Sequence, residues 1–310
     1  MPAINAPHAK RLVTGFISHP PGCRNTGKGS VRDPQGLGWR CASNDREFGM
    51  VIAVAVADTT EGTHCPTTSR VLVDRRMQTR VTVISDTHWR HDDIALPAGD
   101  LLIHCGDMFN LSTRAPQQVR AMDEWFGRQK FERILCTGGN HDRLLEAELT
   151  RGAQPFRNAQ FVMDEIVEYR GLRIFGAPWV PELRTHAFYR DRSSLADAWA
   201  RVPSGIDILI THTPPRGVLD TSSRGRSLGC EALAGELQRI APRVHCFGHV
   251  HAGAGRRQVG GTLFINAASY DGDTGAMRPA AIFTLSSGTG AQPMSWASRL
   301  ARRWLPARPR

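Results

Sequence analysis

The sequence predicts a layered α/β fold for most of this 310-residue chain. From residue 80 onward, short runs rich in Val, Ile and Leu alternate with stretches of helical character, a pattern typical of helices packed on sheets. The composition, with 41% hydrophobic and 22% charged residues, is sufficient for a sizeable core. Polar residues follow directly where several apolar runs end, which is a usual place for a functional site in an α/β sheet.

Eight apolar runs have the length and composition of strands. They cover residues 81–85, 101–104, 133–137, 172–176, 207–211, 244–247, 261–266 and 280–284. Four further segments have helical character and cover residues 115–129, 142–149, 193–200 and 228–240. The predicted folded domain therefore extends over residues 77–293.

The two ends of the chain differ in character from this domain. Residues 1–76 are dense in Gly, Pro, Ser, Thr and Arg and show little sustained periodicity. We expect a poorly ordered extension or, as the alternative, a small appended regulatory or targeting segment. Residues 294–310 end in RRWLPARPR and are expected to form a basic C-terminal tail.

The formal net charge of +10 does not indicate a nucleic-acid-binding domain, because the positive charge lies at the ends of the chain. Residues 1–76 contain 10 Lys or Arg against 6 Asp or Glu, and residues 294–310 contain 5 against none. Residues 77–293 are nearly neutral, with 24 against 23. Long nucleic acids are therefore disfavoured as substrates or partners.

The cysteines and the hydropathy pattern indicate the compartment. Seven cysteines without a CxxC pair, several of them inside apolar runs, are typical of free thiols in a reducing environment. No apolar run approaches the roughly 18 residues of a membrane span, and MVIAVAVA at 50–57 lies too deep for an ordinary signal peptide. We expect a cytoplasmic protein without a membrane-spanning segment.

Five predicted strands run directly into residues that commonly bind metals. VTVIS continues into DTH, LLIHC into GD, RILCTG into GNHD, DILIT into HTPP, and VHCF into GHVH. Strand ends of this kind can converge on one crevice. The residues placed there are Asp86, His88, Asp107, Asn140, His141, His212, His249 and His251.

This mixture of carboxylate, imidazole and amide oxygen suits Mn, Fe or Zn better than Ca or Mg. Eight donors exceed what one ion can use, whereas two ions about 3.5 to 4 Å apart, bridged by a carboxylate, would use them for in-line displacement at phosphorus. The alternative is a set of local structural roles, in which Asp86 caps a turn, Asn140 fills a left-handed position and the histidines pack locally.

Taken in order, the motifs DxH, GD, GNH(D/E), H and GHxH resemble the signature of the calcineurin-like metallophosphoesterase superfamily over about residues 80 to 285. The stretches GDLLIHCGD, APWVP, VPSGIDILITHTPPRGVLD, FGHVHAGAG and TLFINAAS further resemble the metallophosphoesterase domain-containing protein subfamily. The resemblance implies a four-layer α/β/β/α sandwich with a dinuclear metal site at strand ends.

The resemblance also implies a role for each residue. Asp86, His88 and His251 would hold the first metal, Asn140, His212 and His249 the second, and Asp107 would bridge the two. His141 would be the catalytic residue, donating a hydrogen bond to the phosphate or a proton to the leaving oxygen. Some members of the subfamily lack the first histidine of GHxH. Because His249 is present, we expect two metals and a competent enzyme.

The expected activity is hydrolysis of small phosphodiesters by a metal-bridging hydroxide, with cyclic nucleotides as leading candidates and two divalent cations (Mn, Fe or Zn) as cofactors. The chain has GDMFNLS where protein serine/threonine phosphatases have GDxxDRG, so a protein-phosphate substrate is less expected. The alternatives are a phosphomonoesterase or nuclease of the same fold, or a non-catalytic binding protein.

Several neighbouring residues receive weaker expectations. Arg90 and Arg143 lie beside DTH and GNHD and could contact a phosphate, but structural or solvated roles are the favoured interpretation. His91, His104 and His245 fall outside the matched motifs, and we expect no metal role for them.

Overall fold

The computed structural model describes residues 30–32, 38–40, 78–113 and 115–287. The predicted extension and tail lie outside the described residues, except for two short strands, so the domain boundaries stay a prediction. Those strands, β1 (Ser30–Arg32) and β2 (Gly38–Arg40), pair antiparallel. Across the described ranges, no helix combines the length and apolar character that a membrane crossing requires.

Residues 78–287 contain two sheets, one of five strands in the order β13-β3-β4-β5-β6 and one of six in the order β11-β12-β10-β9-β8-β7. The strands of the first are β3 (Gln78–Ile84), β4 (Gly99–His104), β5 (Phe131–Cys136), β6 (Gln160–Phe161) and β13 (Ala281–Ser286). Those of the second are β7 (Glu165–Tyr169), β8 (Leu172–Ala177), β9 (Ile208–Thr211), β10 (Val244–Phe247), β11 (Gly255–Val259) and β12 (Thr262–Asn266).

Both sheets have a parallel centre. Strands β3 to β6 run parallel in one sheet, and β8, β9, β10 and β12 run parallel in the other. The edge strands β13, β7 and β11 pair antiparallel with their neighbours. Because the carboxyl ends of parallel strands meet at one edge of a sheet, the loops after them can share a crevice.

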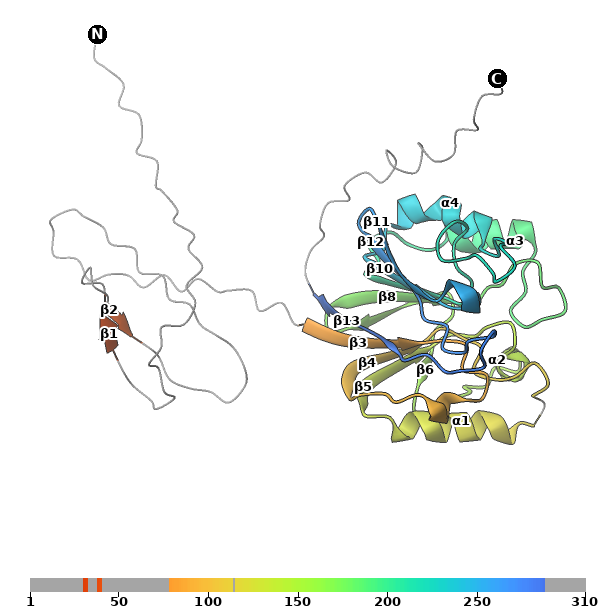
Figure 1. The fold of residues 1–310 in the computed structure, drawn as a ribbon, viewed down its shortest axis with the longest axis horizontal. Helices are drawn as coiled ribbons and strands as arrows, with labels where there is room; N and C mark the ends of the chain where they lie inside the picture. Colours follow the sequence, from red (N-terminus) through yellow and green to blue (C-terminus); the bar gives the residue numbers. More distant parts are fainter. Residues whose placement is uncertain (1–29, 33–37, 41–77, 114, 288–310) are drawn as a thin grey trace, which may run out of the picture. The chain divides into compact units, whose positions relative to one another are not determined.

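The helices cover the outer faces of the two sheets. They are α1 (Gln117–Arg128), α2 (Arg143–Thr150), α3 (Arg192–Ala200) and α4 (Glu231–Ile240), with short 3-10 turns at His91–Asp93 and His251–Gly253. Figure 1 shows α1 outside the five-stranded sheet, α3 and α4 outside the six-stranded sheet, and the sheets facing each other between them. The predicted four-layer sandwich is confirmed.

Buried side chains point alternately to the two faces of each sheet and so divide the core into layers. In β3, Val81 and Val83 belong to the cluster between the sheets, whereas Ile84 belongs to the cluster that includes α1. In β9, Ile208 and Ile210 face the other sheet in the same way. Each such buried side chain contributes roughly 1.5–3 kcal/mol relative to exposure, so the inner layer fixes the register of both sheets.

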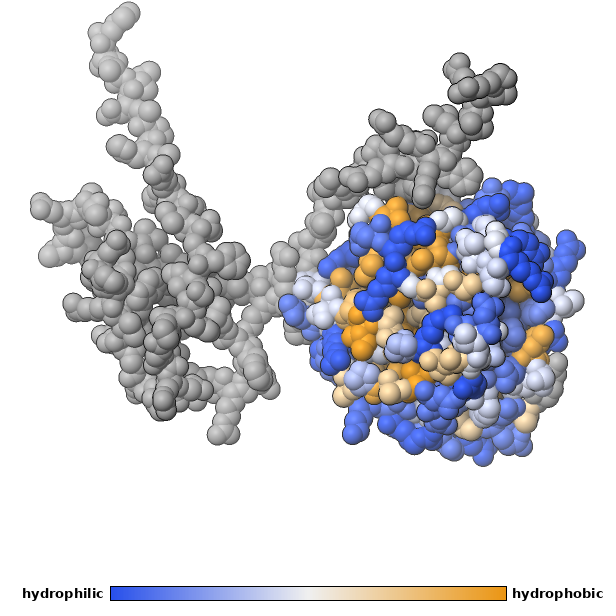
Figure 2. Space-filling model, viewed as in Figure 1, coloured by the Kyte–Doolittle hydropathy of each residue, from blue (hydrophilic) through white to orange (hydrophobic). Residues whose placement is uncertain are grey.

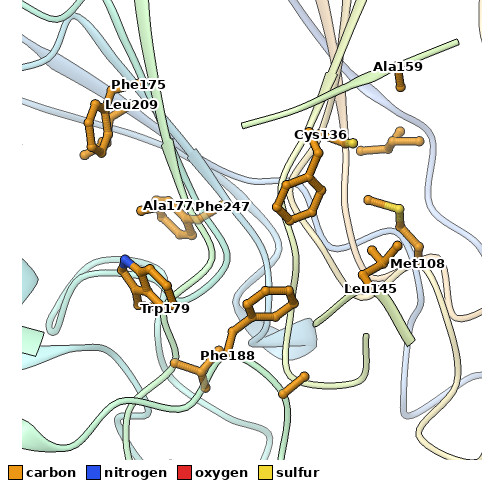
Figure 3. Close-up of a cluster of buried hydrophobic side chains, with 14 of the residues drawn as sticks. Met108, Cys136, Leu145, Ala159, Phe175, Ala177, Trp179, Phe188, Leu209 and Phe247 are labelled. Atoms are coloured by element: carbon orange, nitrogen blue, oxygen red, sulfur yellow. The ribbon is translucent and has the colours of Figure 1, made fainter. Parts of the chain in front are cut away.

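A loop residue, Phe188, packs where the two halves of the outer core meet. Figure 3 shows its ring between Trp179 on one side and Leu145 on the other. Gly138 lies against this ring, and a Cβ there would overlap the Phe188 side chain. Glycine at 138 thus allows close packing at the start of the loop 138–142, which follows β5 and carries two of the predicted site residues.

Every predicted strand and helix overlaps an element of the structure, and five strands were not predicted: β1, β2, β6, β7 and β11. β7 and β11 are edge strands, each paired on one side only, so they bury few side chains. In β11, four of five residues are exposed.

Figure 2 shows hydrophilic residues along most of the periphery of the described body, with apolar residues interspersed.

Candidate metal centre

The eight predicted site residues lie in loops at the carboxyl ends of β3, β4, β5, β9 and β10. Three strands belong to the five-stranded sheet and two to the six-stranded sheet. The two loop groups are joined by a hydrogen bond from the His249 N–H to the Asp86 carboxylate, 3.0 and 2.9 Å from its two oxygens. The structure therefore brings all five motifs to one edge of the sandwich.

The ligand-bearing turns have an unusual backbone. Asp86, His88, Asp107 and His249 all have left-handed conformations, with φ of 53°, 45°, 55° and 68°. A non-glycine residue in this region costs roughly 1–2 kcal/mol, and such residues cluster at functional sites. The turns are held by backbone hydrogen bonds, including Asp86 N–H to Gly106 O at 2.9 Å and His88 N–H to Asp107 O at 3.1 Å.

Three donors form a first group at this edge: Asp86, His88 and His251. The Nε2 atoms of His88 and His251 are 3.2 Å apart, and Nε2 of His251 is 3.3 Å from Oδ1 of Asp86. The Nδ1 atom of His88 lies 3.3 Å from the carbonyl oxygen of Phe109. A carbonyl can only accept, so this nitrogen carries the hydrogen and the lone pair of Nε2 faces the group.

A second group contains Asn140, His212 and His249. The Asn140 Oδ1 atom lies 3.0 Å from Nε2 of His212 and 2.8 Å from Nδ1 of His249. The Nδ1–H of His212 donates to the Cys105 carbonyl at 2.9 Å. Because Asn140 Oδ1 can only accept, Nε2 of His212 donates to it in the metal-free site; when that proton is lost, the lone pair of Nε2 is directed at the other donors.

Asp107 lies between the two groups. Its carboxylate is 3.5 Å from Nε2 of His212 and 3.9 Å from Nε2 of His141. Its donor atom also lies within 4.8 Å of those of Asp86 and His88 in two candidate metal clusters. Asp107 is thus within reach of both groups, and the donor set as a whole fits divalent cations with a mixed N and O preference.

The charges of the site compensate one another. Burial opposes ionisation of Asp86 and Asp107, but the neighbouring histidines outweigh it, and the pKa of each carboxyl lies well below its usual range. Burial also opposes protonation of His212, yet Asp107 raises the pKa of that imidazole to about 9. By contrast, burial and the charge of His212 lower the pKa of His249 to about 4. Without a metal, protonated imidazole thus compensates the charge of the carboxylates, and a bound cation could take over this role.

His141 lies close enough to His88 and Asp107 for the three to form a further group of possible metal donors, but its other contacts set it apart. Its backbone N–H donates to Asp107 Oδ1 at 2.7 Å, while its ring lies beside that of His88, with centroids 4.7 Å apart. Its side chain is 30% exposed, and its buried Nδ1 has no hydrogen-bond partner within the described residues. A side chain at the open rim of the cluster can reach a bound substrate.

At two positions of the site, a glycine allows a carboxylate to lie directly against the backbone. A Cβ at Gly139 would overlap the Asp107 carboxylate, and a Cβ at Gly248 would overlap the Asp86 carboxylate. The glycines of GNHD and GHVH therefore allow close packing, although neither has a positive φ.

Sequence reasoning missed Asp142, the last residue of GNHD. Its buried carboxyl accepts the backbone N–H groups of Asp107 at 2.8 Å, Gly139 at 2.9 Å and Phe109 at 3.0 Å. Burial and the charge of Asp107 raise the pKa of this carboxyl to about 8. Asp142 thus ties the GD turn to the GNHD turn, and its position in the motif was the available signal.

Tyr270 was also missed. Its ring packs against those of His88 and His251, with centroid distances of 5.9 and 5.6 Å. The residue follows β12, and its backbone N–H donates to Asp86 O at 3.2 Å. Its neighbours in the sequence gave no metal-ligand pattern, so only the tertiary packing identifies it.

The two arginines beside the motifs have protein partners. Arg90 pairs with Asp93 at 2.8 Å and donates to the carbonyl of Gly275, and Arg143 donates to the carbonyl of Thr185. These contacts agree with the structural roles that the sequence analysis favours for Arg90 and Arg143.

Comparison with known proteins gives a family match. Residues 79–253 match the family model described as Calcineurin-like phosphoesterase. Metallophosphoesterase domain-containing protein 1 of Homo sapiens is 35% identical over 215 residues, covering 61% of this chain and 65% of that protein. A UPF0046 protein of Caenorhabditis elegans is 35% identical over 204 residues, covering 61% and 69%. The chain thus spans just under two thirds of the human relative.

The fold also resembles a solved structure. A crystal structure with 16% sequence identity matches over 68% of this chain and 100% of its own, with a TM-score of 0.50. At this identity the likeness supports the fold alone.

Proposed function

Because this chain belongs to the calcineurin-like phosphoesterase family, we propose that it is a metal-dependent hydrolase of small phosphodiesters, with cyclic nucleotides as leading candidates. The match confirms the resemblance inferred from the sequence motifs. Family membership and the clustered Asp and His side chains support divalent-metal binding and phosphoester hydrolysis. The preference for diesters, the number of ions and the residue roles are the proposal.

The observation that carries the proposal is the convergence of donors from both sheets. His88 and His212 each use Nδ1–H on a backbone carbonyl and direct Nε2 at the cluster, which is the arrangement of metal-binding histidines. The first ion would be held by Asp86, His88 and His251, the second by Asn140, His212 and His249, with Asp107 shared. When bound, two such cations supply Lewis-acid activation of water and neutralise phosphate charge.

The remaining chemistry belongs to the side chains of the protein. His141 lies at the exposed rim, where its ring can donate a hydrogen bond to a phosphoryl oxygen or a proton to the leaving oxygen. Asp107 accepts the backbone N–H of His141, so the proposed shared ligand also positions the proposed catalytic residue.

A cavity of about 230 Å³ opens beside the GHVH turn, and its small volume supports the proposal of a small substrate. Its volume is below the range of about 300–1,000 Å³ typical of sites for drug-sized ligands, so it fits one substituent of a diester. It is lined by hydroxyl, carboxylate, imidazole and apolar groups, among them Ser222, Ser223, Leu228, His249, His251, Asp271 and Asp273.

The test is a substrate screen with metal-free protein reloaded with Mn, Fe, Co, Ni or Zn. We expect hydrolysis of bis-p-nitrophenyl phosphate and of 2′,3′- or 3′,5′-cyclic nucleotides to exceed hydrolysis of p-nitrophenyl phosphate and single-stranded DNA. Preference for the monoester or for DNA would favour the other enzyme alternatives. Metal binding without hydrolysis of any substrate would favour a non-catalytic binding protein.

A further inference from the structure

Two histidines outside the ligand set are completely buried next to it: His104 at the end of β4 and His245 in β10. Each belongs to a central strand of its sheet. Each ring lies within hydrogen-bond distance of a buried threonine hydroxyl, Thr87 for His104 and Thr211 for His245. Thr87 stands between Asp86 and His88, and Thr211 directly precedes His212. Both histidines therefore contact the ligand-bearing turns without facing the metal cluster.

The hydrogen-bond directions at His104 follow from its partners. The backbone N–H of Gly106 can only donate, and it lies 3.2 Å from Nδ1 of His104. Nδ1 is therefore the acceptor, and in the neutral ring the hydrogen is on Nε2, which donates to Thr87 Oγ1 at 3.1 Å. One ring thus joins the DTH turn to the GD turn.

The second sheet has a similar arrangement. The hydroxyl of Thr211 donates to the carbonyl oxygen of Thr213 at 2.8 Å, so its oxygen accepts from Nε2–H of His245 at 2.9 Å. These two bonds span His212 in the sequence. The Nδ1 of His245 is buried without a hydrogen-bond partner among the described residues, so this ring makes its one polar contact through Nε2–H.

Both rings are neutral under ordinary conditions. Burial lowers the pKa of His104 and of His245 to about 3. A neutral imidazole has one N–H, and the geometry places it on Nε2 in both residues.

We propose that His104 and His245 are positioning residues, each of which donates Nε2–H to a threonine hydroxyl and thereby holds the ligand turn of its own sheet in the metal-binding conformation. The inference rests on the proposed metal-dependent function. The need for such positioning is greatest in the loops of the five-stranded sheet, where Asp86, His88 and Asp107 have a left-handed backbone conformation. Partners that orient metal ligands typically contribute roughly 10- to 100-fold to metal affinity.

The test measures Mn²⁺ affinity by isothermal titration of the full, metal-free chain, well below its thermal unfolding midpoint. Thr87→Val and Thr211→Val keep the shape of the side chain and remove the acceptor, whereas Thr87→Ser and Thr211→Ser keep it. We expect each valine variant to bind Mn²⁺ roughly 10- to 100-fold more weakly, and each serine variant to stay within about threefold of wild type.

Thr82→Val is the matched buried control. Thr82 lies in β3, is completely buried, and its hydroxyl has no hydrogen-bond partner within the described part of the chain. We expect this variant to bind Mn²⁺ like wild type. Loss of affinity in all three valine variants alike would show a general packing effect and overturn the inference.

A second measurement, the side-chain ¹⁵N NMR spectrum of the metal-free protein, does not depend on metal. We expect the Nε2–H tautomer for both His104 and His245 at neutral pH, and the Nδ1–H tautomer in either ring would contradict its proposed role. If wild type binds Mn²⁺ and the valine variants bind it equally well, only the positioning role fails. If wild type binds no metal, the proposed function fails together with it.

Discussion

The two sheets contribute different chemistry to the shared site. The loops of the five-stranded sheet supply both carboxylates, Asp86 and Asp107, together with the Asn140 amide. The loops of the six-stranded sheet supply only imidazoles: His212, His249 and His251. Neither half alone contains the donors of either proposed ion, so the site depends on the packing of one sheet against the other. Perturbations on the two sides should therefore have different consequences.

The largest effect should come from Asp107→Asn, which removes the proposed shared carboxylate. This change also leaves His212 without the charge that raises its pKa to about 9. We expect kcat/KM for bis-p-nitrophenyl phosphate to fall by more than about 10⁴-fold, because contacts to both ions are lost. The exposed Asp197→Asn in α3 is the control, and comparable activity of the two variants would contradict the shared role.

His141→Ala should separate turnover from metal binding on the side of the five-stranded sheet. We expect kcat to fall by roughly 10²- to 10⁴-fold, while Mn²⁺ content measured by elemental analysis stays at the wild-type level. His186→Ala is a matched control, because that ring lies near His141, with centroids 6.3 Å apart, but outside the ligand set. Loss of metal from the His141 variant would show that the residue is a ligand instead.

His249→Gly should affect the imidazole side selectively. We expect the fold to remain intact, one ion to bind roughly 10- to 100-fold more weakly, and the preferred metal to change, because Asn140 Oδ1 loses its neighbour at 2.8 Å. Titration with Mn²⁺ and Zn²⁺ measures both effects. A variant that binds the same ions with unchanged affinity would remove His249 from the proposed site.

Gly248→Ala should disturb the contact between the two sheets. The added Cβ would overlap the Asp86 carboxylate, and overpacking of this kind typically costs about 1–3 kcal/mol. Thermal unfolding of the metal-free protein measures the loss. Gly235→Ala in α4, where a Cβ would meet nothing within 4 Å, should instead be neutral or stabilise by up to about 1 kcal/mol. Equal stability of the two variants would contradict the packing account.

The pH dependence of metal binding should give the smallest change per step, because it concerns the proton of a single residue, His212. Because Asp107 raises the pKa of His212 to about 9, a metal that binds below this pH must displace a proton. Affinity should therefore fall by up to about tenfold for each pH unit below 9 for this one proton. His249, with a pKa of about 4, is already neutral at pH 7 and adds no such dependence. Affinity that does not change between pH 9 and 6 would contradict the proposed role of His212.

Sequence reasoning located the strands that carry the site because the carboxyl-terminal part of each strand is buried on both faces. In β10, for example, the predicted and observed bounds coincide at residues 244–247, all of which are buried. The edge strand β11 was missed because GRRQV is largely exposed, although Gly260 and Gly261 after it are a hairpin signal.

The site was predictable to the extent that its members follow apolar strands. All eight predicted residues come together, but the pattern contained no information on the left-handed backbone of Asp86 or His249. Asp142 and Tyr270 were missed for a related reason. Their roles depend on contacts with residues far away in the sequence, such as Asp107 N–H with Asp142 and the His88 ring with Tyr270.

The central claim is that donors from both sheets form one site for two ions that hydrolyses small phosphodiesters. The most direct measurement is calorimetric titration of the metal-free chain with Mn²⁺, with bis-p-nitrophenyl phosphate hydrolysis assayed at each ratio of metal to protein. We predict that two ions bind per chain and that activity rises to its maximum as the second ion binds. Binding of no Mn²⁺, or saturation with Mn²⁺ without hydrolysis, would contradict the claim.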